Sequence, residues 1–167
     1  LKILFVTCFD SPGGQSNRSY LFAKELDKIG HNITYFTNKY NHLDDHKRSM
    51  RDLNLDNNIK HIFVDNKNFK NNKIVSVMLN CLTLLKFLKK NKFDIIISSS
   101  VPLINSFFAL IAKKRGTKFF FDLRDVWPDA LFYTGQISKL NPIYIILKMM
   151  QIIIYKYSNG LISALPN

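Results

Sequence analysis

Mostly apolar segments of five to seven residues alternate with segments of helical period along the chain, and this alternation constrains the fold more than any other feature. The apolar segments are rich in β-branched and aromatic residues, which is typical of strands buried on both faces. They cover residues 1–7, 32–37, 59–64, 93–98, 117–122 and 160–164. Helices are predicted between them over about 18–29, 74–90, 102–115 and 142–157. Successive strand–helix units predict a Rossmann-like, doubly wound α/β fold, with a mainly parallel sheet of about six strands and helices on both faces.

Length and composition agree with one such domain spanning residues 1–167. The chain has 167 residues, of which 47% are hydrophobic, enough to form a buried core. Its 24 Lys and Arg exceed its 12 Asp and Glu, which leaves a net charge of +12. This excess favours an anionic partner, such as a phosphate-bearing small molecule, an acidic membrane surface or nucleic acid. A solvated basic surface without a partner is the alternative.

The cysteines and histidines show no metal-binding pattern. Cys8 and Cys81 lie in apolar surroundings, which predicts buried, reduced thiols in a cytoplasmic protein. The four histidines have no ligand spacing either, so we expect no metal. The longest apolar stretch, 143–157, contains two lysines and a glutamine and is too short for a membrane-spanning helix. We expect its apolar surface to pack on the sheet, and docking on anionic lipid is the alternative for this helix.

Ligands in open parallel sheets bind beyond the carboxyl ends of the strands, so the loops that follow the strands are the places to search. The loop after the first strand carries Gly13 and Gly14 and leads into a helix. Two glycines allow a close backbone approach, and a helix N-terminus favours an anion. A tight turn without a ligand is the alternative interpretation of this loop.

The fifth strand ends in a polar segment, Phe121–Asp129, with the sequence FDLRDVWPD and the one tryptophan of the chain. One interpretation is a structural Asp–Arg pair with the tryptophan as a packing anchor. The other is a binding site in which Asp125 orients a hydroxyl group, Arg124 contacts a phosphate and Trp127 stacks on a sugar.

Together, these segments resemble the N-terminal half of family-4 glycosyltransferases. The resemblance rests on the opening residues 1–37, on Asn41–Leu43 (NHL) and above all on Phe121–Leu131 (FDLRDVWPDAL). It is strongest to the subgroup that builds bacterial O-antigen and capsular polysaccharides, including fucosamine-transferase-like members.

This resemblance implies one half of a GT-B enzyme, in which two Rossmann-like domains face each other across a cleft. The N-terminal domain mainly binds the acceptor, the C-terminal domain mainly binds the nucleotide-sugar donor, and no cofactor or metal is needed. By position, Gly13 and Gly14 would lie near the donor phosphates, and Asp125 would be the catalytic residue that contacts the acceptor hydroxyl. Acceptor or cleft contacts would come from Asn17, Arg18, His42, Arg124 and Trp127.

Two departures from the family pattern matter. Many relatives carry a histidine after the fourth strand, whereas Ser98–Pro102 has none, so the roles of that histidine do not transfer. The donor domain with its glutamate-rich motif is also absent from these 167 residues. We therefore expect this chain alone to be an incomplete, inactive half of a transferase.

The resemblance also implies a lipid-linked saccharide acceptor, so we expect a cytoplasmic protein that is peripheral on the inner membrane face. The lysine-rich end of the 74–90 helix would then contact anionic lipid, although lysines also suit a helix C-terminus without any partner. The alternative function is a non-catalytic basic module that binds a polyanion. Nucleic acid is not expected, because no nucleic-acid-binding motif appears. A flavodoxin-like regulatory domain would need an acidic pocket after the first strand, where only Asp10 stands.

Overall fold

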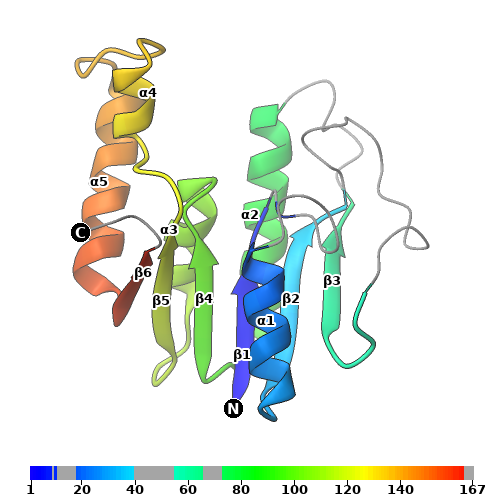
Figure 1. Ribbon diagram of the computed structural model, residues 1–167. Coiled ribbons are helices and arrows are strands. Elements are labelled where there is room, and N and C mark those ends of the chain that lie inside the picture. The colour runs from blue at the N-terminus through cyan, green and yellow to red at the C-terminus, as the bar shows by residue number, and fades with distance from the viewer. Residues whose placement is uncertain (9, 11–17, 40–54, 66–72, 164–167) are drawn as a thin grey trace.

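The computed structural model describes residues 1–8, 10, 18–39, 55–65 and 73–163. Its strands are β1 (Lys2–Val6), β2 (Asn32–Asn38), β3 (Lys60–Val64), β4 (Ile95–Ser99), β5 (Lys118–Leu123) and β6 (Gly160–Ser163). Its helices are α1 (Arg18–Lys28), α2 (Lys73–Lys90), α3 (Leu103–Ala112), α4 (Asp129–Tyr133) and α5 (Pro142–Tyr157). The predicted alternation of strands and helices is confirmed (Figure 1).

All strands join one parallel sheet in the order β3-β2-β1-β4-β5-β6. The chain moves outward from β1 to β3, then returns to place β4 on the other side of β1. This reversal creates a switch point between β1 and β4, where ligands bind in folds of this type. The prediction of a Rossmann-like α/β fold with about six strands is therefore confirmed.

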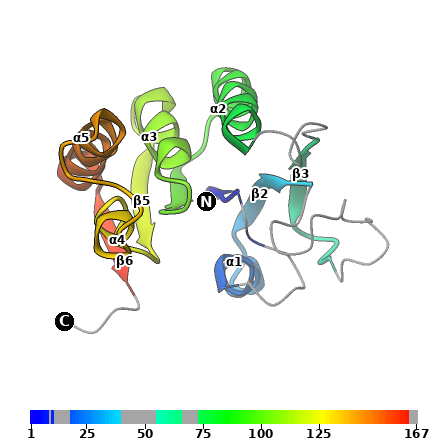
Figure 2. The same ribbon diagram turned by 90° about the horizontal axis from the view of Figure 1, so that it is seen from above.

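Helices cover both faces of the sheet, as predicted. Helix α1 lies on one face, whereas α2, α3 and α5 lie side by side on the other (Figure 2). Parallel crossovers are right-handed, so reversing the direction of travel across the sheet moves the connecting helices to the opposite face. The side chains of β1 alternate accordingly: Ile3 and Phe5 pack toward α1, and Leu4 and Val6 pack toward the helix layer behind.

Three details differ from the sequence prediction. Helix α3 ends at Ala112 rather than near residue 115, because Lys113 has an extended backbone. The short helix α4 lies in a segment predicted to be a loop, since five residues are too few to show a helical period. The prediction that α5 packs its apolar surface on the core is wrong for one side of the helix. Tyr144, Gln151 and Ile154 are buried, but much of the opposite, apolar side is exposed.

Both thiols are buried and neither forms a disulfide, as predicted from the apolar surroundings of Cys8 and Cys81. Burial raises the pKa of the Cys81 thiol to about 12. Measured against the thickness of a bilayer, none of the described helices has the length and apolar content needed to span it.

Candidate active site

The carboxyl ends of β1, β4 and β5 bring the candidate site together at the switch point. Four of the predicted site residues are described: Arg18 begins α1, and Arg124, Asp125 and Trp127 follow β5. Other predicted site residues lie outside the described part of the chain, namely Gly13, Gly14, Asn17 and His42.

Two ion pairs cross this edge of the sheet. Arg124 pairs with Asp10, which follows β1, and Arg18 Nη2 lies 3.0 Å from Asp122 Oδ1 at the end of β5. The carboxylates are the buried partners, with Asp10 only 1% and Asp122 only 4% exposed. A buried carboxylate is costly without a partner, so the two arginines compensate the charges that the fold places at this edge.

The surroundings of this network shift several pKa values. Burial raises the pKa of Asp122, although Arg18 and Arg124 oppose that rise. For Arg124, burial favours the neutral form, but Asp10, through its charge and its hydrogen bond, together with Asp122 and Tyr35, raises the pKa above the ordinary value, so the guanidinium stays charged. Burial, together with the charge of Asp10, keeps Tyr35 a neutral phenol by raising its pKa well above the ordinary value.

Asp10 is anchored by strand β2 as well as by Arg124. The Tyr35 hydroxyl donates to Asp10 Oδ2 at 3.1 Å, and Thr37 Oγ1 donates to the Asp10 carbonyl oxygen at 3.3 Å. Sequence reasoning gave Asp10 no part in the candidate site, and Asp122 was not singled out from the polar segment that contains it. One sequence feature could have identified both residues, because each is a carboxylate placed near the carboxyl end of a buried strand.

Ser100, which follows β4, binds the backbone of the loop that carries Asp125. Its hydroxyl oxygen accepts hydrogen bonds from the backbone N–H groups of Arg124 (3.0 Å) and Asp125 (3.2 Å). Its own N–H donates to the Asp122 carbonyl at 2.9 Å. The backbone on both sides of Arg124 is thereby held to β4.

The Asp125 side chain is exposed, in contrast to Asp10 and Asp122. Within the described residues, no hydrogen bond or ion pair occupies its carboxylate. The Trp127 N–H donates to the Asp125 carbonyl at 2.9 Å, which closes a tight turn. A carboxylate held on a fixed backbone but open to solvent can accept a hydrogen bond from a substrate hydroxyl.

Of the two interpretations offered for Arg124, a structural Asp–Arg pair or a phosphate contact, the structure favours the pair. Its guanidinium forms an ion pair with Asp10. Of the described residues, no group of three histidine, cysteine, aspartate or glutamate side chains is placed to hold a metal ion.

A clamp beside this edge joins α4 to α5. The Tyr144 hydroxyl donates to Asp129 Oδ1 at 2.6 Å, and the Lys148 ammonium donates to Asp129 Oδ2 at 2.6 Å. These two hydrogen bonds lower the pKa of Asp129 below its ordinary value.

Asp129→Asn is expected to lower the free energy of unfolding by about 1 kcal/mol at neutral pH, a modest loss because the clamp is partly exposed. The lowered folded-state pKa means that this stabilisation is present above the unfolded value near 3.8 and is lost as pH falls through the folded value. Urea unfolding of parent and variant at neutral and acidic pH tests this. A variant that is as destabilised in acid as at neutral pH would contradict the assignment.

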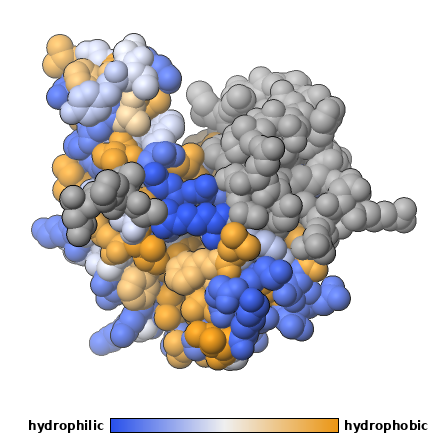
Figure 3. Space-filling model, in the orientation of Figure 1, coloured by the Kyte–Doolittle hydropathy of each residue, from blue (hydrophilic) through white to orange (hydrophobic). Residues whose placement is uncertain are grey.

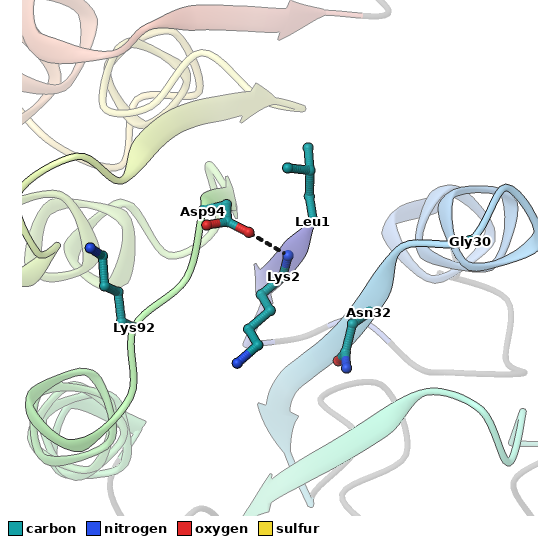
Figure 4. Close-up of a pocket in the computed structure, with 6 residues that line it drawn as sticks. All are labelled: Leu1, Lys2, Gly30, Asn32, Lys92 and Asp94. Carbon is teal, nitrogen blue, oxygen red and sulfur yellow. Dashed lines mark hydrogen bonds between the residues drawn. The ribbon is translucent and has the colours of Figure 1, made fainter.

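The described part of the chain also has a hollow of about 490 Å³ at the opposite, amino edge of the sheet. Leu1, Lys2, Gly30, Asn32, Lys92 and Asp94 line it (Figure 4). The Lys2 N–H donates to Asp94 Oδ2 at 2.7 Å across it. It is open and lies away from the switch point, so the carboxyl edge remains the candidate active site.

Comparison with known proteins agrees with this architecture. No curated protein matches the chain. The sequence model described as Glycosyltransferase Family 4 matches residues 12–163, which include every described strand except β1 and every described helix. The chain therefore belongs to glycosyltransferase family 4.

Proposed function

We propose that the chain is the N-terminal, acceptor-side domain of a retaining glycosyltransferase. In this proposal, a sugar moves from a nucleotide-sugar donor to a lipid-linked saccharide in the synthesis of a bacterial cell-surface polysaccharide. The O-antigen and capsule subgroup, with fucosamine-transferase-like members, is the proposed assignment within family 4. The observation that carries the proposal is the exposed Asp125 carboxylate, whose backbone N–H is held by Ser100 at the carboxyl edge of a family-4 domain.

The proposed reaction joins the acceptor hydroxyl oxygen to the anomeric carbon while the bond from that carbon to the donor diphosphate breaks. Asp125 accepts a hydrogen bond from the acceptor hydroxyl, orients it for attack and takes up its proton as the new bond forms. Groups that stabilise the negative charge of the departing diphosphate lower the barrier further.

The remaining predicted residues divide between substrate contact and positioning. We assign Gly13 and Gly14 to the donor-phosphate side of the cleft. Acceptor or cleft contacts are assigned to Asn17, Arg18, His42 and Trp127. Arg124 becomes a positioning residue, because its guanidinium is paired with Asp10 and its backbone with Ser100. A second Rossmann-like domain, outside these 167 residues, would bind the nucleotide-sugar.

A transfer assay tests this proposal. UDP- and GDP-sugars are offered with a short polyprenyl-diphosphate saccharide to the 167-residue chain, with and without the product of the downstream coding region. Transfer only with the added region supports the proposal and places donor binding outside this chain. Transfer by the 167 residues alone would overturn the two-domain proposal, and no transfer in either form would overturn the transferase itself.

A further inference from the structure

A second cavity lies at the amino edge of the sheet, next to the open hollow described above and more enclosed than it. It has a volume of about 420 Å³, within the range of roughly 300–1,000 Å³ that is typical of small-molecule sites. Lys2, Lys60, Lys90 and Lys92 all line it, and no acidic residue does so in the part of the chain that the structure describes. We call this space the lysine cavity.

The pleat of the sheet directs two of these lysines toward α2. Side chains two positions apart on a strand share a face. Lys2 and Lys60 stand two positions before Leu4 and Ile62, which pack in the core on the side of α2. The strand register places Lys60 beside Thr34, another residue that lines the cavity. The starts of β1, β2 and β3 therefore form the sheet side of the lysine cavity.

The last turn of α2 and the connection to β4 form its other side. Lys90 ends the helix and Lys92 follows it. The negative end of a helix favours a nearby cation, but this explains only Lys90, because Lys2 and Lys60 begin strands. The Phe87 carbonyl of this turn already accepts hydrogen bonds from the Asn91 backbone N–H at 3.1 Å and from its side-chain amide at 2.8 Å.

The lysines of this cavity have no carboxylate partner. Among the described residues, none of the four forms an ion pair. Asp94 lines only the adjoining hollow, and its Oδ2 accepts a hydrogen bond from the Lys2 backbone N–H at 2.7 Å (Figure 4). The face that carries α1 differs, since hydrophilic and hydrophobic residues are interspersed there (Figure 3) and Lys28 pairs with Glu25 at 2.6 Å.

Neutral hydrogen-bonding groups complete the lining. Thr34 is only 5% exposed, yet its hydroxyl forms no hydrogen bond with any described residue. The side-chain amide of Asn32, which also lines the cavity, is likewise without a hydrogen bond in the described ranges. Buried hydroxyl groups normally have a partner, so the Thr34 hydroxyl is available to a ligand oxygen.

We propose that the lysine cavity binds a small soluble anion that carries two or more phosphate groups. Ammonium groups bind phosphate as point charges. Each phosphate group carries a charge of about −1.5 to −2 at neutral pH, so two of them balance four lysines. Thr34 and Asn32 supply additional donors. The inference goes beyond the proposed function, because the cavity lies at the edge of the sheet opposite Asp125.

Isothermal titration calorimetry of the 167-residue chain with inorganic pyrophosphate tests this site. Saturable binding that weakens as salt is added is expected, because salt screens the lysines. Orthophosphate, with half the phosphate groups, should bind about tenfold more weakly or less, because it reaches fewer of the ammonium groups. No saturable pyrophosphate binding at low ionic strength, or equally tight orthophosphate binding, would overturn the proposal.

Variants locate the binding. Lys60→Gln/Lys90→Gln is expected to weaken pyrophosphate binding about tenfold or more, and Thr34→Val to weaken it by less. Lys86→Gln/Lys89→Gln is the matched control, since it removes the same charge from exposed positions of α2 outside the cavity and should bind nearly like the parent. Thermal unfolding shows whether each variant is folded. Equal losses in the two double variants would indicate diffuse charge attraction, and no loss with Lys60→Gln/Lys90→Gln would place binding elsewhere; either result overturns the proposal.

Competition separates a soluble anion from other sources of phosphate. Phosphatidylglycerol vesicles and a short DNA duplex are each added to the pyrophosphate complex, and neither is expected to displace an anion from a concave cavity. Displacement by either one, abolished in Lys60→Gln/Lys90→Gln, would make a lipid headgroup or nucleic acid the ligand and overturn the proposal. These titrations contain no sugar donor or acceptor, so failed pyrophosphate binding and failed sugar transfer are distinguishable results.

Discussion

Asp125→Asn is expected to lower the turnover of the assembled transferase by about 10²–10⁴-fold, the range attributed to one positioned acid–base group. Asparagine keeps the size of the side chain but is a much weaker acceptor for a hydroxyl proton. Because Asp125 is exposed and its backbone is held through Ser100, the substitution should leave the fold intact. Steady-state sugar transfer, combined with thermal unfolding, measures both consequences.

Asp94→Asn is a suitable control for that experiment. Asp94 is also exposed, but it lies at the amino edge, where its carboxylate accepts a hydrogen bond from the Lys2 N–H. The control makes the same change of charge away from the switch point and should leave turnover unchanged. If Asp125→Asn keeps activity within a few-fold of the parent, Asp125 does not orient the acceptor.

Arg124→Ala is expected to lower the free energy of unfolding by about 3 kcal/mol, because it removes the cation that faces a buried carboxylate. Asp10 is 1% exposed, so water cannot readily replace the guanidinium. The Tyr35 hydroxyl still donates to Asp10, which keeps the loss at the lower end of the usual range. Urea unfolding of parent and variant gives the difference.

The double variant Arg124→Ala/Asp10→Asn separates the charge effect from lost packing. With the carboxylate neutralised, the double variant should recover part of the stability that Arg124→Ala loses. Arg18→Ala, which breaks the more exposed pair with Asp122, should cost less than Arg124→Ala. An Arg124→Ala variant within about 0.5 kcal/mol of the parent would show that the buried pair contributes little.

Local patterns in the sequence were enough to predict the fold. A strand buried on both faces needs a continuous apolar run, and a covering helix needs apolar residues at helical spacing, so each element is recognisable from its own residues. Helix α5 illustrates this, since Asn141 and Pro142 mark its start and the observed bounds are those predicted. The connection rules of parallel sheets then directed attention to the loop that carries Asp125.

The partners of those loop residues depended on the tertiary structure. Arg124 and Asp10 are 114 positions apart, and they meet because β4 and β5 continue the sheet beyond β1. The exposure of the outer side of α5 was likewise not predictable from the sequence, because that sequence is apolar enough to suggest complete burial.

Sequence by itself thus determined the strands and the longer helices, their order and the edge at which polar groups gather. Only the tertiary structure decided which carboxylate is paired, which is open to a substrate and which apolar side chains remain exposed. The physical reason is that periodicity is a property of neighbouring residues, whereas burial and ion pairing depend on segments distant in the chain.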